Sequence, residues 1–312
     1  MLSRDSTLTP LTANLSCFAA MFTWSVGFPA ADVLLQSWGA ISLISTRQLL
    51  GVAPLLIAWV LIDGWRQVAS APWKRGLGVG GLGFGLGAIL LLVGQQLSDP
   101  VTPAVAAAMM PIAGALLEVV FDNRRLRPML MLAIILVLLG GYLATGMGSG
   151  EATFELGALL CLVAVFLFAW ATRMTTHHIT NLSPIGKTTI TLMGGTIFIW
   201  VTYIVYLLAN FPGIEIGIID THNIILLLIF SVASLGIAQL MWIWGASKLG
   251  ILVASFHMNA VPFYVMVIMV VLFGNSWSWT QTSGALLVAI GVLLSQLRYG
   301  IVQPYVCNFG LV

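Results

Sequence analysis

The segments AAAMMPIAGALL, residues 106–117, and HMNAVPFYVMVI, residues 257–268, align on a proline that is surrounded by apolar residues. These prolines, Pro111 and Pro262, are 151 positions apart. The same offset pairs glycines on both sides of the two segments: Gly94 with Gly245 and Gly140 with Gly291. A correspondence over this distance indicates that the chain consists of two similar halves.

The composition indicates that the solvent of this chain is lipid. Of the 312 residues, 60% are hydrophobic and 7% are charged. Soluble domains carry about 25% charged residues, and a chain this apolar could not bury its apolar surface in water. Basic runs with interleaved aromatic residues do not occur, so we expect no nucleic-acid binding. Cys17, Cys161 and Cys307 show no C-x-x-C spacing, which argues against a metal site or a disulfide framework.

Ten apolar runs are long enough for membrane helices, which need about 20 residues each. The connections between them are short and leave no room for a soluble domain. We therefore predict an all-α membrane protein in which any chemistry takes place among the helices. The predicted spans are residues 11–31, 38–62, 76–97, 102–121, 128–146, 155–172, 186–210, 222–245, 250–273 and 280–297.

The basic residues are distributed unevenly between the two sides of the membrane. If the N-terminus is inside, eleven of the twelve Lys and Arg residues fall in inward segments, and the twelfth, Arg47, lies within a span. The outward loops contain acidic residues but no basic ones. By the positive-inside rule, this pattern predicts that both termini are cytoplasmic. The expected location is a bacterial inner membrane.

The two halves are expected to be inverted relative to each other, because five helices per half is an odd number. We place the first repeat at residues 1–147, the second at 148–300 and a cytoplasmic tail at 301–312. Trp24 in the first helix has a rough partner in Trp170 of the sixth. Inverted repeats occur in many secondary transporters, whose substrate sites lie near the midplane at the repeat interface.

Several features also carry a resemblance to a known family. They are Trp24, Arg47, GQQLSDPVTPAVAAAMMPI (94–112), GASKLGILVASFHMNAVPF (245–263) and LFGNSWSWTQTSGALLVAIGVLL (272–294). Over nearly its whole length, the chain resembles the EamA branch of the drug/metabolite transporter superfamily. The resemblance implies a ten-helix carrier made of two inverted five-helix repeats. Characterised members mostly export amino acids or other small metabolites, and one exports aromatic amino acids.

The chain departs from the family pattern at one place in each half. Members often have Gly-Glu after the fourth and ninth helices. This chain has Gly274-Asn275 after the ninth and FDNRR, residues 121–125, after the fourth. The departure puts in doubt any ion pair that the glutamate would make.

Arg47 is the only basic residue near the middle of a predicted span, whereas Lys187 lies at the very start of one. A charge there costs about 2.5–3.5 kcal/mol on insertion scales, so we expect it to face a wet cavity or a partner. One interpretation is a bidentate grip on a substrate carboxylate. The other is a structural role, in which the guanidinium bonds the backbone carbonyls of a broken neighbouring helix.

The segment around Pro262 supplies further candidates. In a regular helix His257 and Tyr264 share one face, and Asn259 and Phe263 lie roughly opposite, but Pro262 would bend the helix near its middle. His257 either lines a cavity or bonds a neighbouring helix, and the repeated proline favours the cavity. The candidates from this segment and its first-half counterpart are His257, Asn259, Phe263, Tyr264, Met109 and Met110.

Four more candidates lie on other helices. Gln239 and Trp242 are three positions apart and share a face of the eighth helix. Trp24 and Trp170 lie too deep in their spans to be interfacial anchors. Such rings either pack between helices or contact an aromatic, amphipathic or cationic substrate.

Together these features favour a secondary transporter that exports amino acids or similar small metabolites by alternating access. Arg47 would hold an anionic group, and the other candidates would supply hydrogen bonds and apolar contacts. Transport would be downhill or proton-linked, with His257 as the titratable group at depth. The alternatives are an uncoupled, channel-like facilitator and a membrane-embedded enzyme, although the dense midplane set of acid–base residues that an enzyme needs does not occur.

We expect no cofactor and no metal. GVGGLG, residues 78–83, matches G-x-G-x-x-G, but it lies inside a predicted membrane helix with no strand before it. Its glycines instead allow a neighbouring helix to approach closely. The expected partners are the lipid bilayer and a small-molecule substrate, and the sequence is compatible with a monomer.

Overall fold

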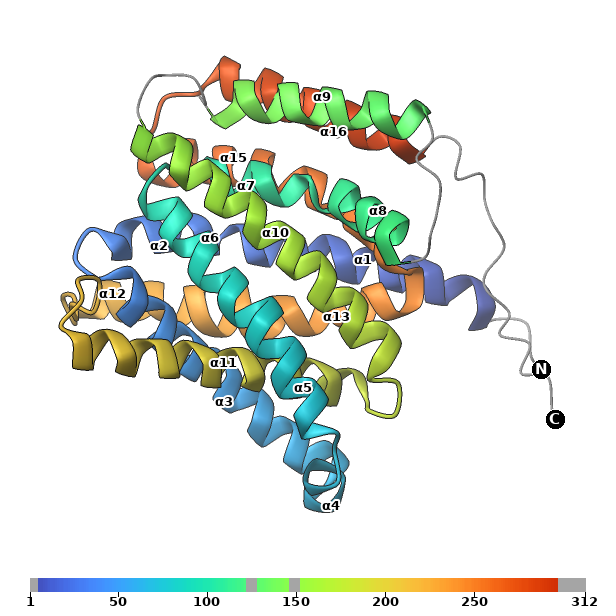
Figure 1. The fold of residues 1–312 in the computed structure, drawn as a ribbon, viewed down its shortest axis with the longest axis vertical. Helices are drawn as coiled ribbons and strands as arrows, with labels where there is room; N and C mark the ends of the chain where they lie inside the picture. The colour runs from blue at the N-terminus through green and yellow to red at the C-terminus, as the bar shows by residue number, and fades with distance from the viewer. Residues whose placement is uncertain (1–4, 122–127, 146–151, 297–312) are drawn as a thin grey trace.

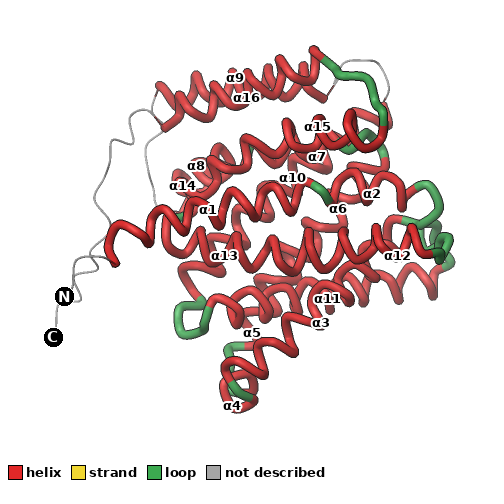
Figure 2. Tube along the Cα trace, turned by 180° about the vertical axis from the view of Figure 1, so that it is seen from behind, coloured by secondary structure: helices red, strands yellow, loops and turns green. Residues whose placement is uncertain are grey.

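The structure, a computed structural model, describes residues 5–121, 128–145 and 152–296. Every regular element in these residues is a helix (Figures 1 and 2). The predicted tail at 301–312 and most of the FDNRR segment lie outside the described residues.

The helices follow one another with short connections. The first half contains α1 (Asp5–Ser25), α2 (Gly27–Leu35), α3 (Ala40–Asp63), α4 (Trp65–Ala69), α5 (Trp73–Val79), the π-helix η1 (Gly80–Gly85), α6 (Leu86–Gln96), α7 (Val101–Ala108), α8 (Met110–Phe121) and α9 (Pro128–Thr145). The second half contains α10 (Ala152–His178), α11 (Pro184–Ala209), α12 (Thr221–Leu228), the π-helix η2 (Ile229–Ile237), α13 (Ala238–Leu249), α14 (Ile251–Ser255), the 3₁₀ turn η3 (Phe256–Ala260), α15 (Val261–Phe273) and α16 (Trp279–Gln296).

The helices confirm a multi-pass, all-α membrane protein. Seven spans in the described residues are long and apolar enough to cross a membrane, and an eighth follows if α7 and α8, which meet at a 40° bend, form one span. Two shorter apolar helices are Met131–Ala144 and Trp279–Leu294. The ten predicted ranges are helical apart from short breaks and ends, but ten membrane crossings stay a prediction.

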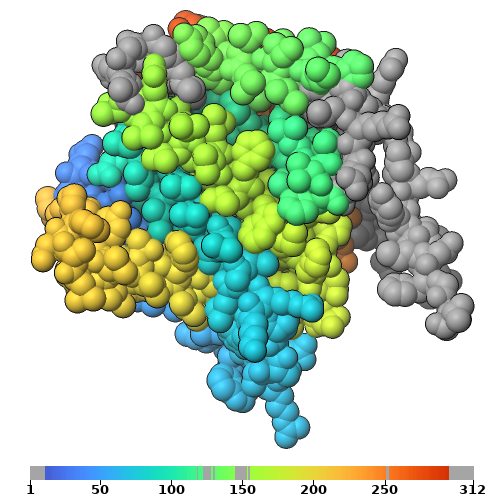
Figure 3. All heavy atoms as spheres, viewed as in Figure 1, coloured from blue at the N-terminus to red at the C-terminus, as the bar shows by residue number. Residues whose placement is uncertain are grey.

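Apolar side chains cover the outer faces of the helices. In Figure 3, α9, α10 and α11 all reach the visible surface of the molecule, with α6 between α10 and α11. Helices α9, α10 and α11 each expose large apolar side chains, including Ile135, Leu159, Val163 and Val201. In water such a face would be unstable, whereas lipid tails solvate it.

Both proline-bearing segments are broken helices, although the breaks precede the prolines. Helix α7 ends at Ala108, and Met110–Phe121 begins a new helix with Pro111 in its first turn. In the second half, residues 256–260 form a 3₁₀ turn, and Pro262 lies in the first turn of α15. Proline is tolerated there because the first N–H groups of a helix have no intrahelical partner. The second-half span is thus interrupted near its middle, directly before Pro262, and a bend at this proline stays a prediction.

Asp99, which lies between α6 and α7, determines where α7 begins. Its Oδ1 accepts hydrogen bonds from the N–H groups of Val101 and Thr102 at 2.8 and 2.6 Å. Its Oδ2 accepts from Gln281 Nε2 of α16 at 3.0 Å. Burial raises the pKa of the Asp99 carboxyl, while these hydrogen bonds favour the charged form. The carboxylate thus caps α7 and joins it to the last helix.

The helices of the two halves pack as equivalent pairs. Helix α1 packs on α13 and α6 packs on α10; η1 packs on α11 and η2 packs on α3. The broken helices α7 and α15 contact each other, as do α9 and α16, which lie side by side at the top of Figures 1 and 2. All of these contacts join one half to the other, and the first four form two equivalent pairs, which is the arrangement of a two-repeat protein.

The contacts also show how the two halves correspond residue by residue. A side chain at Gly94 would clash with Cys161, and one at Gly245 would clash with Cys17. Gly94 and Gly245 are 151 positions apart, but Cys17 and Cys161 are 144 apart. The first two spans of each repeat therefore align at 144 and the later ones at 151. Trp24 corresponds to Phe168, and its predicted pairing with Trp170 is wrong.

Candidate functional site

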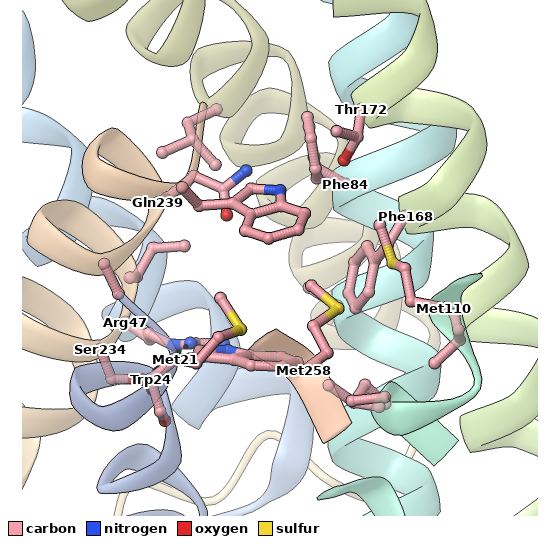
Figure 4. A pocket seen from close by; sticks show the side chains of 18 of the residues that line it. Met21, Trp24, Arg47, Phe84, Met110, Phe168, Thr172, Ser234, Gln239 and Met258 are labelled. Carbon is pink, nitrogen blue, oxygen red and sulfur yellow. Dashed lines mark hydrogen bonds between the residues drawn. The ribbon is translucent and has the colours of Figure 1, made fainter. Parts of the chain in front are cut away.

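A cavity lies between the two repeats, with an empty volume of about 700 Å³ that includes the part open to the outside. Most of the lining is apolar (Figure 4). The lining residues are Met21, Trp24, Arg47, Gln48, Phe84, Ala88, Leu91, Ala107, Met110, Val165, Phe168, Thr172, Leu192, Ser234, Leu235, Ala238, Gln239, Trp242 and Met258.

Most of the lining consists of equivalent residues from the two repeats. At the offset of 144 the pairs are Met21/Val165, Trp24/Phe168 and Gln48/Leu192. At the offset of 151 they are Phe84/Leu235, Ala88/Gln239, Leu91/Trp242 and Ala107/Met258. A cavity lined in this way lies on the pseudo-twofold axis that relates the repeats, where inverted-repeat carriers bind their substrates.

Two π-helical segments border the cavity at equivalent positions. The offset of 151 aligns residues 80–85, which form η1, with residues 231–236, which lie within η2. The wider turns bring Phe84 from η1, and Ser234 and Leu235 from η2, into the lining. Short π-helical stretches are rare and are frequent at functional sites.

Arg47 of α3 is 7% exposed and bonds η2 across the repeat interface. Its Nε donates to the backbone oxygen of Phe230 at 2.9 Å, and its Nη2 donates to Ser234 Oγ at 3.3 Å. The guanidinium carbon also lies 4.2 Å from the centre of the Phe230 ring. Ser234 Oγ in turn donates to the backbone oxygen of Trp24 at 3.4 Å. Arg47 therefore makes the structural contact of the second interpretation and lines the cavity as well.

The charge of Arg47 has no negative counterpart in the cavity. Among the described residues that line it, Arg47 carries a formal charge and no carboxylate is present. An arginine has five N–H donors, and the two contacts to Phe230 and Ser234 use two of them. A buried cation without a negatively charged partner is expensive, so the site suits an anionic ligand group.

Three polar atoms in the lining are buried and have no hydrogen-bond partner among the described residues: Gln48 Oε1, Thr172 Oγ1 and Gln239 Nε2. Gln48 and Thr172 are each 1% exposed. Buried polar groups are nearly always bonded to protein or water, so these three atoms offer acceptor and donor positions to a molecule in the cavity.

Aromatic rings and thioethers make up much of the remaining wall. Phe84 and Phe168 stack with ring centres 6.2 Å apart, and Trp24 meets Phe28 edge to face at 5.0 Å. Methionine side chains adapt to differently shaped ligands because they are unbranched and polarizable. The sulfur atoms come from Met21, Met110 and Met258 (Figure 4).

Five of the eleven predicted site residues line this cavity: Trp24, Arg47, Met110, Gln239 and Trp242. Six do not: Met109, Trp170, His257, Asn259, Phe263 and Tyr264. Gln48, Phe168 and Thr172 line the cavity but are not among the predicted residues. The identical Cys17 and Cys161, 144 apart, were the signal that could have aligned Trp24 with Phe168.

The 3₁₀ turn η3 directs one of its side chains, but not the predicted ones, to the cavity. In η3, Met258 faces the cavity, while His257 Nδ1 lies 3.0 Å from the backbone oxygen of Ala254 in the preceding helix. Tyr264 packs edge to face on Phe18 and Phe22, whose rings are about half exposed on the outer side of α1. A role for these residues in substrate binding stays a prediction without support from the cavity.

The structure describes no group of three or more His, Cys, Asp and Glu side chains that could hold a metal ion. The cavity donors are a guanidinium, amides and hydroxyls, which suit an organic ligand with a carboxylate better than a metal.

Comparisons with known proteins agree with this fold. The model of the EamA-like transporter family matches residues 11–146 and again residues 155–297. One solved structure, described as "Crystal structure of protein", is similar to this chain with a TM-score of 0.67 and 18% identity, over 91% of this chain and 96% of that one. At this identity the similarity shows the fold alone. No curated protein matches the chain.

Proposed function

The chain belongs to the EamA-like transporter family, whose members are membrane transporters, and on this premise we propose that it is a secondary transporter of amino acids or similar small carboxylates. The substrate occupies the cavity on the pseudo-twofold axis. Alternating access exposes the cavity to each side of the membrane in turn. One of two equivalent sets of helix contacts between the repeats opens while the other closes. Net transport is export from the cytoplasm.

The observation that carries this proposal is the uncompensated charge of Arg47. Its guanidinium lines the cavity with no carboxylate beside it in the described lining. A substrate carboxylate would supply the missing charge and accept two parallel hydrogen bonds. Gln48, the next residue on α3, offers an acceptor oxygen that suits an ammonium group. The aromatic rings suit an apolar or aromatic body between the polar ends.

The lining also bears on energy coupling. No Asp, Glu or His lines the cavity in the described residues, so the lining offers no group that would bind a coupling proton near neutral pH. We therefore propose that export runs down the substrate's own gradient.

We further propose ten spans with both termini in the cytoplasm of a bacterium, repeats at 1–147 and 148–300, and a tail at 301–312. The distribution of Lys and Arg supports this topology. In cells that carry Cys307→Ser, a cysteine introduced at the exposed Ile219 should react with a membrane-impermeant thiol reagent, and one at Arg66 should react only after permeabilisation. The reverse pattern would mean that the orientation is wrong.

The transport function is tested with purified protein in liposomes loaded with L-amino acids. Uptake of labelled substrate should saturate with concentration, and unlabelled substrate inside should drive counter-flow of the label. Linear flux without counter-flow would favour a channel-like facilitator. A chemically altered product would favour an enzyme, and the absence of flux for every amino acid and small carboxylate would refute the proposal.

A further inference from the structure

The polar groups of the cavity lie at two separate ends. Arg47 and Ser234 lie on one side, and Thr172 and Gln239 lie across the open space from them (Figure 4). Rings and thioethers, including Trp24, line the space between the two ends. The proposed carboxylate site accounts for the first end only. The second end has no role in holding an anion.

Thr172 of α10 differs from its neighbours in the way its hydroxyl is used. Thr175 Oγ1 and Thr176 Oγ1 donate to the carbonyl oxygens of Ala171 and Thr172, four residues earlier, at 2.7 and 2.9 Å. This is the usual bond of a threonine within a helix. Thr172 Oγ1 has no partner among the described residues, although the residue is 1% exposed and lines the cavity. Its hydroxyl is therefore available to a molecule in the cavity.

Gln239 of α13 has the same property. Its Nε2 is buried and has no partner among the described residues, and the residue lines the cavity. A glutamine amide carries both a donor and an acceptor, as a threonine hydroxyl does. Each of the two side chains can therefore bond either a hydroxyl or a carboxamide.

The fold does not require polar groups at these two positions. The equivalent of Gln239 in the first repeat is Ala88, which also lines the cavity, and the equivalent of Thr172 is Phe28. The same packing is thus built with apolar residues on the other side of the pseudo-twofold axis. Buried polar atoms without partners lower stability, so their presence on one side alone indicates a ligand that satisfies them.

We propose that Thr172 and Gln239 are specificity-determining residues, which bind a neutral hydrogen-bonding group at the end of the substrate remote from its carboxylate. The substrate class is then amino acids whose side chain ends in a hydroxyl or a carboxamide. This inference rests on the proposed transport function. A site with buried hydrogen-bonding groups rejects an analogue that lacks the matching group, because its own polar atoms stay unpaired.

The test compares matched substrate pairs in liposomes: L-tyrosine with L-phenylalanine, and L-glutamine with L-norleucine. The wild type should carry the hydrogen-bonding member of at least one pair with a kcat/KM roughly 10- to 100-fold higher. In Thr172→Val, which keeps the shape of the side chain, this ratio should fall toward one while transport of the apolar member is kept. Gln239→Leu should act in the same direction.

The matched control is Thr175→Val. It removes a hydroxyl from the same helix, but that hydroxyl is bonded to Ala171 and does not line the cavity. It should leave the substrate ratio unchanged, and a shift as large as that of Thr172→Val would overturn the proposal.

The wild type itself provides two further outcomes. If it carries amino acids but does not prefer the hydrogen-bonding member of either pair, the specificity proposal fails and the transport function stands. If it carries no amino acid or small carboxylate at all, both proposals fail.

Discussion

Arg47→Gln is expected to weaken binding of a carboxylate substrate by at least about 30-fold, because truncating one partner of a buried charge pair costs about 2–5 kcal/mol. The variant removes the positive charge from a cavity that has no other charged group in its described lining. Binding is measured from the substrate dependence of counter-flow or from quenching of tryptophan fluorescence, since Trp24 and Trp242 line the same cavity.

Two comparisons separate the loss of a ligand contact from the loss of structure. The decarboxylated amine of the same substrate should bind the wild type weakly, and Arg47→Gln should not weaken that binding further. Arg47→Lys keeps the charge without the planar fork, so it should lie between the wild type and Arg47→Gln.

Arg47 also bonds the backbone oxygen of Phe230, so the variants are first checked for an unchanged melting temperature. If Arg47→Gln does not fold, Ser234→Ala serves instead, because it leaves the charge in place and removes the Nη2 contact together with the bond from the hydroxyl to the backbone oxygen of Trp24. It should weaken binding by less than 10-fold, since the charge that attracts the carboxylate is kept. Wild-type affinity in a folded Arg47→Gln protein would contradict the carboxylate site.

Gly80→Ala is expected to destabilise the protein by about 3 kcal/mol, the upper end of the range for an overpacked contact. Gly80 is the first residue of the π-helix η1, and a Cβ atom there would overlap the carbonyl oxygen of Thr191 in α11. The obstacle is backbone, so a side-chain rotation cannot relieve the overlap and the two helices must separate. Thermal unfolding in detergent should show a melting temperature lower by about 5–10 °C.

The matched control is Gly78→Ala, two residues earlier. A Cβ atom at Gly78 would meet nothing within 4 Å, and alanine is a better helix former than glycine by up to about 1 kcal/mol. Its melting temperature should be equal to that of the wild type or slightly higher. Equal stability of the two variants would show that α11 does not approach η1 as closely as the structure has it.

The positions of the helices could be predicted because hydropathy is a local property. An apolar run of about 20 residues forms a helix in lipid whatever its neighbours are, because every backbone N–H and C=O must be bonded within the segment. The offset between Pro111 and Pro262 was also visible, since both prolines mark breaks. The geometry of these breaks could not be predicted from the sequence. A proline can lie within a helix or begin one, and only the hydrogen bonds of residues 256–260 show that Pro262 lies in a first turn.

The site could be predicted only in part. Arg47 was recognised because a charged side chain in the middle of an apolar span is costly and is therefore usually functional or paired. Gln48, its neighbour, and Thr172 were not recognised, because a single amide or hydroxyl within a membrane helix is common and most such groups bond their own helix. The unpartnered state of these atoms is a property of their surroundings in three dimensions.

By itself, the sequence determined that this chain is an all-α membrane protein with two similar halves and one buried cation. The tertiary structure decided which faces of the helices meet at the pseudo-twofold axis, and therefore that Trp24 lies opposite Phe168, with Thr172 across the cavity from Arg47. The physical reason is the solvent. In water, the polar face of a helix marks its outer side, but in lipid both faces are apolar, so the inward face becomes known only when the helices are packed.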